Sequence, residues 1–344
     1  MIDLRSDTVT LPPKEMKEYM FNAPLGDDVF GEDPSINKLE KKISLLFGKD
    51  DALFVPSGTM ANLISVLSHC QRGEEILLGN QSHIFKYEAG GISAFGGIHS
   101  HQLHNNDDGT IDIDAIISGI NNSDDSHHAI TKLVCLENTH NTCYGSPIDS
   151  DYFTKVKEAI SHYDIKLHID GARIFNASIA LNQSVSTLAK NAESVTCCLS
   201  KGLSCPSGSV IIGTHDFISK ARRLRKVAGG GMRQAGILAA AGIYALDNMI
   251  NRLVEDHQNA QLIGEELQNI NYIKLDSKKV TTNLVFFYLE KDSMSDNEFI
   301  KELLDHDIKV DSKGNRKFRI ATHYGFTNND IEKVIKTIKF ILDK

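Results

Sequence analysis

An acidic and a basic side chain follow two segments of the chain at a spacing that suits covalent catalysis. Asp170 comes directly after the segment KLHI (166–169), and Lys201 follows the segment 194–199, so the two residues are 31 positions apart. That separation is about one strand–helix–strand unit. A desolvated lysine at a strand end can act as a nucleophile. The plainer alternatives are a solvent-exposed Lys201 and a structural salt bridge between Asp170 and Arg173.

Two further segment ends could bind a phosphorylated ring. The turn Ser57-Gly58-Thr59 follows an apolar segment, and free backbone N–H groups at a helix start favour a phosphate. His83 also follows an apolar segment, where its ring could stack on a ligand or form a hydrogen bond to it. A simple helix cap and a capped loop histidine are the alternatives.

Taken together, these groups match the needs of one cofactor. Pyridoxal phosphate takes a lysine for its Schiff base and an acidic partner for its pyridine nitrogen, and it carries a phosphate. A nucleophilic lysine, a carboxylate, a ring and a phosphate-suited turn therefore make this cofactor plausible.

Alternating strand and helix segments would position these residues. Runs rich in Val, Ile and Leu alternate with longer segments of helical periodicity. The runs span residues 52–57, 75–80, 132–138, 166–170, 194–200 and 209–214. This alternation predicts an α/β fold, with a parallel sheet covered by helices on both faces. Ligands bind beyond the carboxyl ends of the strands in such sheets, where these polar residues lie.

The pattern changes from about residue 235. A long stretch of helical periodicity covers 235–270, and extended runs follow at 282–289 and 317–323 before a terminal helix. This predicts a smaller α+β domain. We expect residues 1–245 to form an N-terminal arm and a large domain, and residues 246–344 to form the small domain.

Several segments together resemble the low-specificity threonine aldolases, which belong to the aspartate-aminotransferase-like group of pyridoxal-phosphate enzymes. The segments are DLRSDTVT (3–10), GDDVFGEDPS (26–35), FVPSGTMAN (54–62), SHIFKYEAGG (82–91), ENTHN (137–141), HIDGARIFNA (168–177), CLSKGL (198–203), GGGMRQAG (229–236) and FRIATH (318–323). The resemblance implies a seven-stranded sheet of the type shared by these enzymes. It also implies a lyase that cleaves L-threonine, L-allo-threonine and related β-hydroxy-α-amino acids to glycine and an aldehyde.

The same resemblance assigns residues to the cofactor, position by position. It makes Lys201 the residue that forms the Schiff base, and Asp170 the partner of the pyridine nitrogen. His83 would stack on the ring, while Gly58 and Thr59 would hold the phosphate.

Other residues would bind the substrate. The resemblance places Ser6, Arg173 and Arg319 at the substrate carboxylate, and His140 near the side-chain hydroxyl. His83 and His140 are both candidates for the base that takes the hydroxyl proton, directly or through a water.

The resemblance also implies an assembly of at least two chains, and a homotetramer built of two such dimers. Arg233, in the segment GGGMRQAG, would reach the cofactor phosphate of a neighbouring subunit. Phe30 stands where the family usually has a tyrosine, so a hydroxyl near the mouth of the site is missing.

Two other functions fit the same residues. An aminotransferase or a β-eliminating lyase would share the fold and the cofactor but break another bond. A protein that binds pyridoxal phosphate without catalysis is the second alternative. The complete set of Lys201, Asp170, His83 and two arginines argues against it.

Composition excludes several classes of protein. The 344 residues carry 37 Lys and Arg against 45 Asp and Glu, a net charge of −8, which argues against general nucleic-acid binding. We expect no membrane span, because no apolar run approaches about 20 residues. The charged start of the chain lacks the features of a signal peptide, and the six cysteines form no CxxC motif. A cytoplasmic enzyme with reduced thiols is expected.

Two basic or imidazole clusters are not assigned to the site. His99, His101 and His104 could suit a metal, but no carboxylate or thiol lies at ligand spacing in the sequence, so no metal is expected. The run of basic residues between 220 and 226 is expected to form a solvated or subunit-facing helix surface.

Overall fold

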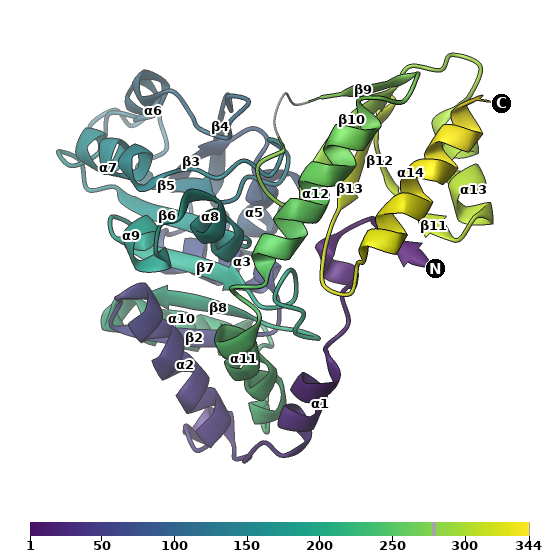
Figure 1. The fold of residues 1–344 in the computed structure, drawn as a ribbon. Coiled ribbons are helices and arrows are strands. Elements are labelled where there is room, and N and C mark those ends of the chain that lie inside the picture. The colour runs from purple at the N-terminus through teal and green to yellow at the C-terminus, as the bar shows by residue number, and fades with distance from the viewer. Residues whose placement is uncertain (277–279, 344) are drawn as a thin grey trace.

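A seven-stranded sheet forms the centre of the larger part of the molecule (Figure 1). The computed structural model describes residues 1–276 and 280–343. The strand order is β2-β8-β7-β6-β5-β3-β4, and β8 runs antiparallel to β2 and β7 while the other pairings are parallel. The strands are β2 (Asp51–Val55), β3 (Glu75–Gly79), β4 (His99–Leu103), β5 (Thr131–Glu137), β6 (Lys166–Gly171), β7 (Ser194–Cys198) and β8 (Ser209–Gly213). The predicted α/β class, with a mostly parallel sheet, is confirmed.

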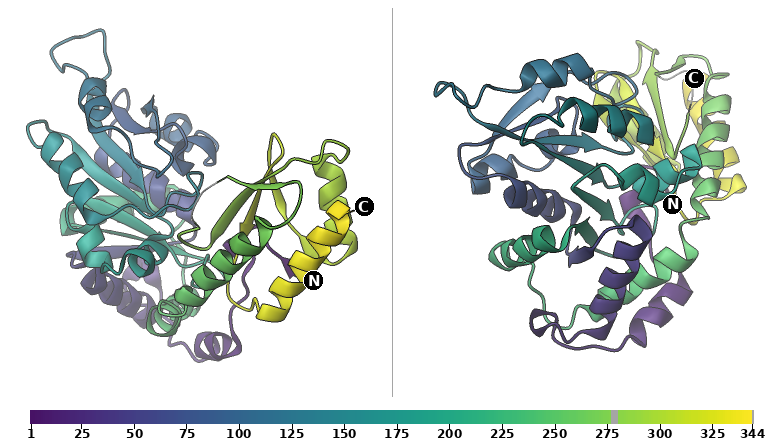
Figure 2. Two further views of the ribbon diagram at one scale, coloured as in Figure 1. Left: turned by 45° about the horizontal axis from the view of Figure 1, so that its top comes forward. Right: turned by 90° about the vertical axis from the view of Figure 1, so that its left-hand side faces the viewer.

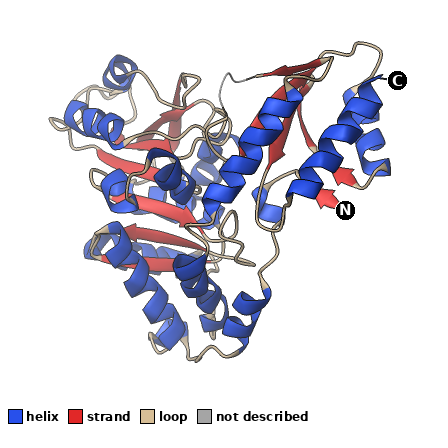
Figure 3. Ribbon diagram, in the orientation of Figure 1, coloured by secondary structure: helices blue, strands red, loops and turns tan. Residues whose placement is uncertain are grey.

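Helices cover both faces of this sheet (Figure 3). One face packs against α2 (Pro34–Phe47), α7 (Ser150–Ala159), α8 (Ile174–Leu181), α9 (Val185–Ala189) and α11 (Gly236–Asn248). The other face packs against α3 (Gly58–His69), α5 (Gly91–Gly96) and α10 (His215–Val227). Because both faces are covered, inner strands such as β7 are buried along their whole length, which explains their continuous apolar runs. Three further helices are α1 (Lys14–Phe21), α4 (His83–Lys86) and α6 (Ile113–Gly119).

A second, antiparallel sheet forms the C-terminal part, in the order β12-β13-β10-β9. Its strands are β9 (Ile273–Leu275), β10 (Leu284–Leu289), β12 (Asp311–Gly314) and β13 (Lys317–Ala321). The apolar side chains of β9, β10 and β13 share one core with those of α12 (Leu253–Leu267), α13 (Asp296–Asp305) and α14 (Asn328–Asp343). This α+β arrangement agrees with the sequence pattern. Helix α12 also contacts α8, so it joins the two parts.

The N-terminal arm belongs spatially with the C-terminal part (Figure 2). Strand β1 (Ile2–Asp3) pairs in parallel with β11 (Ile308–Lys309). Further along, the Ala321 amide donates to the Leu4 carbonyl at 2.9 Å. The 3₁₀ turn Asp7–Val9 follows directly, so β1 fixes the start of the chain beside the second sheet. A second 3₁₀ turn spans Asp28–Phe30.

The helical stretch expected over residues 235–270 is two helices. Helix α11 ends at Asn248 and α12 begins at Leu253. The two helices pack against different partners, since α11 contacts α1 and α2 whereas α12 contacts β10 and α14. The break lets each helix bury its own apolar face. The expected division between residues 245 and 246 falls inside α11, and we propose a boundary at the break.

The basic run at 220–226 and the histidine cluster around residue 101 both make contacts within the chain. Arg225 of α10 is buried and pairs with Asp28 at 2.7 Å, so this part of the basic run is not the solvated surface that was expected. Glu75 of the neighbouring strand lies 3.4 Å from His101 and 3.6 Å from His99. The parallel pairing of β3 with β4 supplies this carboxylate, which the spacing in the sequence could not reveal.

Two further features concern the cysteines and the helices. All six cysteines are free and buried, and burial raises the pKa of the Cys70 and Cys143 thiols to about 12. Among the described residues, no helix combines the length and the apolar character needed to cross a membrane.

Candidate active site

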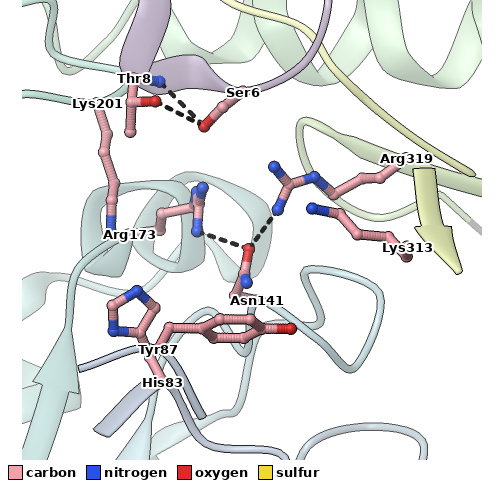
Figure 4. Close-up of a pocket in the computed structure, with 9 residues that line it drawn as sticks. All are labelled: Ser6, Thr8, His83, Tyr87, Asn141, Arg173, Lys201, Lys313 and Arg319. Carbon is pink, nitrogen blue, oxygen red and sulfur yellow. Dashed lines mark hydrogen bonds between the residues drawn. The ribbon is translucent and has the colours of Figure 1, made fainter. Parts of the chain in front are cut away.

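A cavity of about 210 Å³ lies where the N-terminal arm, the strand ends of the large sheet and the small sheet meet (Figure 4). Its lining residues are polar, and most carry a nitrogen or a hydroxyl group. They are Ser6, Thr8, His83, Tyr87, Asn141, Arg173, Lys201, Lys313 and Arg319. The cavity therefore brings together Ser6, His83, Arg173, Lys201 and Arg319 of the residues predicted from the sequence.

Lys201 enters the cavity from the loop after β7. Its backbone is held firmly, because its carbonyl accepts hydrogen bonds from Thr10 Oγ1 at 3.2 Å and from the Ser204 amide at 2.8 Å. Within residues 1–276 and 280–343, no carboxylate lies within ion-pair distance of Lys201 Nζ. An amine that is not bound to a carboxylate can act as a nucleophile once it is deprotonated.

Asp170 ends the neighbouring parallel strand β6, so it lies at the same edge of the sheet as Lys201. The carboxylate is buried, and its two oxygens have separate partners. Oδ2 accepts from Asn62 Nδ2 at 2.8 Å, and Oδ1 accepts from the Ala172 amide at 3.1 Å. A fixed, buried carboxylate of this kind can hold a proton on a ligand nitrogen.

Arg173 is buried and faces the cavity with one edge of its guanidinium group. Its Nε and NH2 atoms donate to the two carboxylate oxygens of Asp7, at 2.7 and 2.8 Å. NH1 donates to Asn141 Oδ1 at 3.2 Å. Burial favours the neutral form of Arg173, but the charge and hydrogen bonds of Asp7 outweigh it and raise the pKa of Arg173. The fork of Arg173 is thus occupied by Asp7, and a substrate carboxylate is left with NH1.

Arg319 approaches the same amide oxygen from β13. Its NH1 donates to Asn141 Oδ1 at 2.9 Å, and its NH2 donates to the Arg5 carbonyl at 2.8 Å. Burial lowers the pKa of Arg319, and the nearby charge of Arg173 lowers it further. Two guanidinium groups that share one neutral acceptor form a strong site for an anion.

Comparison with known proteins identifies the family. The model of the beta-eliminating lyase family matches residues 3–291. The chain belongs to the beta-eliminating lyase family.

Within this family, the alignments with named relatives span most of the chain. Low-specificity L-threonine aldolase 1 of Arabidopsis thaliana is 46% identical over 333 residues, which are 96% of this chain and 93% of the relative. Low specificity L-threonine aldolase of Escherichia coli K12 is 45% identical over 302 residues, 88% of this chain and 89% of the relative. These matches confirm the resemblance to low-specificity threonine aldolases and the expectation of a lyase.

The fold of the lyase is also found in solved structures. A threonine aldolase from Leishmania major superposes with a TM-score of 0.83 at 20% identity, over 99% of this chain and 100% of the other. At this identity the match supports the fold alone.

The remaining predicted residues do not line the cavity. His140 is buried, and its Nδ1 accepts from the Cys143 amide at 3.3 Å. Its Nε2 forms no hydrogen bond among the described residues and lies 4.0 Å from Glu137 Oε2. Arg233 is half exposed and pairs with Asp27 of its own chain at 3.1 Å. Asp170, Gly58 and Thr59 are also absent from the lining. Their roles stay predictions.

The turn at Gly58 starts helix α3 and packs closely against the sheet. Ser57 caps α3 by accepting from the Met60 amide at 3.2 Å, and the first turn of a helix leaves other N–H groups unpaired. A Cβ on Gly58 would lie 2.7 Å from Cys198 Sγ, so the backbone approaches the sheet closely and only glycine fits.

The sequence did not single out several residues that line the cavity or bind its lining residues. Asp7 lies beside Ser6 in the segment DLRSDTVT, and Asn141 lies beside His140 in ENTHN. The sequence points to Ser6 and His140 in these segments. The polar cluster in each segment is the signal that could have pointed to Asp7 and Asn141 as well. Lys313 carries no local signal, because the β12–β13 pairing alone brings it to the cavity.

The carboxylate of Glu88, to which the sequence did not point either, holds the ring of His83. Its Nδ1 lies 2.8 Å from Glu88 Oε1, and Asn62 Nδ2 bridges Glu88 and Asp170 at 2.8 Å each. Burial lowers the pKa of His83, but the hydrogen bond to Glu88 and the nearby carboxylates outweigh it, so the net shift is upward. A ring nitrogen of His83 and one carboxylate oxygen each of Glu88 and Asp170 lie within 4.8 Å of one another. Asn62 donates hydrogen bonds to both carboxylates, which accounts for their closeness.

Glu88→Gln should lower the pKa of the His83 ring. The variant removes the charge that stabilises the imidazolium form, while burial of the ring is unchanged. An NMR titration of the histidine ring signals of the purified protein measures the shift. Glu332→Gln on the surface of α14 is the control and should leave His83 unchanged. An identical His83 titration in Glu88→Gln would contradict this assignment.

Asp7→Asn should destabilise the protein by about 3–5 kcal/mol, because it leaves the buried Arg173 without its counter-charge. Urea unfolding at neutral pH measures the loss. Arg173 holds the pKa of Asp7 well below its ordinary value, despite burial, so the contribution is present above that ordinary value. The difference between wild type and variant should therefore shrink as acid protonates Asp7.

A matched control for this measurement is Asp305→Asn, which breaks an exposed pair with Lys301. It should change the free energy of unfolding by less than about 0.5 kcal/mol. Equal effects of the two variants would argue against a special role for Asp7.

Proposed function

We propose that this lyase is a pyridoxal-phosphate-dependent threonine aldolase. It cleaves L-threonine, L-allo-threonine and related β-hydroxy-α-amino acids between Cα and Cβ, and releases glycine and an aldehyde. The observation that carries the proposal is the cavity itself. It combines the amine of Lys201, the ring of His83 and the paired arginines in a chain whose relatives are named threonine aldolases.

The residues fit pyridoxal phosphate. The close-packed turn at Gly58 and Thr59 offers a helix start for the phosphate, and Asp170 offers a carboxylate for the pyridine nitrogen. Lys201 Nζ is the amine that would attach the cofactor covalently, and the His83 ring would cover it. When bound, the cofactor supplies an electron sink for the pair released from the Cα–Cβ bond.

The arginines and Ser6 orient the substrate. Arg319 and NH1 of Arg173 would take the α-carboxylate in place of the Asn141 oxygen, which they now share. Ser6 Oγ lines the same cavity and is fixed by Thr8, whose hydroxyl lies 2.9 Å away. Fixing the carboxylate sets which bond of Cα stands ready to break.

A histidine takes the proton of the β-hydroxyl group. Glu88 holds Nδ1 of His83, so Nε2 is the atom of that ring left to exchange a proton in the cavity. His140 is the other candidate, and it lies one residue from Asn141, which lines the cavity. Either group can act directly or through a water.

Product analysis tests this proposal. The purified holoenzyme is incubated separately with L-threonine and L-allo-threonine, and glycine, acetaldehyde, ammonia and keto acids are measured in the same samples. Glycine and acetaldehyde in equal amounts are expected. Ammonia and a keto acid without aldehyde would indicate a β-eliminating lyase instead. A keto acid formed only with an added amino-group acceptor would indicate an aminotransferase.

The lyase acts as a homodimer at least, and as a homotetramer built of two such dimers. Arg233 of each chain would reach the cofactor phosphate of its neighbour, which a phosphate of charge near −2 would favour. The half-exposed side chain makes this possible once its contact with Asp27 is exchanged.

Subunit complementation tests the shared site. Lys201→Ala and Arg233→Ala proteins are mixed under conditions of verified subunit exchange. Mixed dimers carry one site with neither change, so activity should return. A fully active monomer, or no recovery after exchange, would contradict the shared site.

A further inference from the structure

A second cavity, of about 190 Å³, adjoins the first. The two cavities share Tyr87, Asn141, Lys313 and Arg319 in their linings. Beyond these residues, the second cavity is lined by Gln81, Lys86, Thr142, Phe286 and Lys317. A substrate held by Arg319 therefore has a continuous space on the far side of Asn141 and Tyr87.

The lining of the second cavity is strongly positive. It contains Lys86, Lys313, Lys317 and Arg319, and no aspartate or glutamate is among its lining residues in the described chain. These four cations come from helix α4 and from the strands β12 and β13, so the fold gathers them from distant parts of the sequence.

Nearby carboxylates compensate only part of this charge. Asp311 pairs with Lys313, and Asp276 pairs with Lys317. Lys86 Nζ instead donates to the neutral Gln81 Oε1 at 2.9 Å. Across residues 1–276 and 280–343, no carboxylate lies within ion-pair distance of Lys86 or Arg319.

The surroundings of Lys313 show the same excess of positive charge. Burial lowers the pKa of Lys313, and the charge of Arg319 lowers it further, although Asp311 acts in the opposite direction. A negative group placed between these cations would relieve their repulsion. One such group, the α-carboxylate of an amino acid, is taken by Arg319 and Arg173. Another would meet Lys86, which has no carboxylate partner in the described chain, and Lys313, which would share its charge between Asp311 and the new group.

We infer that the second cavity binds a carboxylate at the end of the substrate side chain. The lyase would then favour β-hydroxy-α-amino acids with an acidic side chain over neutral ones of the same size. This inference rests on the proposed aldolase function and names a substrate class for it. In the reaction of 3-hydroxyglutamate, the Cα–Cβ bond breaks, the β-hydroxyl proton passes to the base, and Cα gains a proton. The products are glycine and 3-oxopropanoate.

A pair of substrates that differ in charge alone tests the inference. The holoenzyme is assayed with 3-hydroxyglutamate and with its amide, 3-hydroxyglutamine, which has the same shape and a neutral end. Threonine serves as the reference. The kcat/KM ratio of acid to amide should be about tenfold, the typical value of one hydrogen bond to a charged group. A ratio of one or below would overturn the inference.

Variants locate the effect. Lys86→Met and Lys313→Met should each bring the ratio of acid to amide toward one, and Lys313→Arg should largely preserve it. Lys336→Met is the control, because this lysine is exposed on α14, outside the linings of both cavities, and should leave the ratio unchanged. The ratio is taken within each variant, so a general loss of activity does not affect it. An unchanged ratio in Lys86→Met and Lys313→Met would overturn the assignment of these lysines.

Binding measurements separate this inference from the proposed function. If no substrate yields glycine, the aldolase function fails, yet calorimetric titration with acid and amide still tests the cavity. Tighter binding of the acid that weakens in Lys313→Met supports the cavity, and equal binding of the two overturns it.

Discussion

Lys201→Ala should abolish the cleavage of L-threonine and the visible absorbance of the bound cofactor. Lys201 Nζ is the amine positioned in the cavity to form a covalent bond, and it lies on a backbone that two hydrogen bonds hold in place. Alanine removes the nucleophile and leaves those backbone bonds intact. The expected loss is therefore chemical and should leave the fold unchanged.

Lys336→Ala is the matched control, since it removes an exposed lysine of α14. Activity, absorbance and thermal unfolding are measured for both variants. A folded Lys201→Ala protein that keeps both its turnover and its visible absorbance would disprove the role of Lys201. Added primary amines that restore part of the turnover would support it.

Asp170→Ala should reduce kcat by about 10²–10³-fold, the usual effect of removing a buried group that stabilises developing charge. The carboxylate lies at the end of β6, fixed by Asn62 and by the Ala172 amide. Without it, the ring nitrogen of the cofactor loses the partner that keeps it protonated. Steady-state kinetics with saturating cofactor measure the loss.

Asp170→Asn separates charge from shape. Asparagine fills the same space but carries no negative charge, so it should show nearly the same loss as alanine. Activity close to wild type in Asp170→Asn would mean that the charge of Asp170 is dispensable. A loss that more cofactor fully reverses would mean that Asp170 serves binding alone.

The sequence predicts the large sheet well because its strands are buried on both faces. The segment before Asp170 and the segment before Lys201 correspond to β6 and β7. Apolar residues such as Leu167, Ile169 and Val195 are the signal of burial there, although polar residues stand between them. Strand β4, of sequence HSHQL, lies at the edge of the sheet and is largely polar, so the same criterion does not find it. The sequence pattern does not reveal the break between α11 and α12 either, because the helical periodicity continues across it.

The residues of the candidate site also differ in whether the sequence reveals them. Lys201 and His83, which line the cavity, could be placed there from the sequence, because each follows a strand and strand ends meet at one edge of a parallel sheet. The contact between Asp7 and Arg173 joins residues far apart in the chain, and nothing local to either residue encodes it. Lys313 depends on the pairing of β12 with β13, so its place in the cavity required the structure.

The pairing of β1 with β11 has a consequence for how the enzyme is made. Ribosomes deliver residues 2–8 long before residues 308–321, yet these segments are neighbours in the finished molecule. A nascent chain can fold its large sheet while the arm that carries Ser6 still lacks a partner strand. Arg319 is synthesised after every strand of the large sheet, so the lining of the cavity is completed after that sheet. Newly synthesised enzyme should become active only after residues 308–321 have left the ribosome.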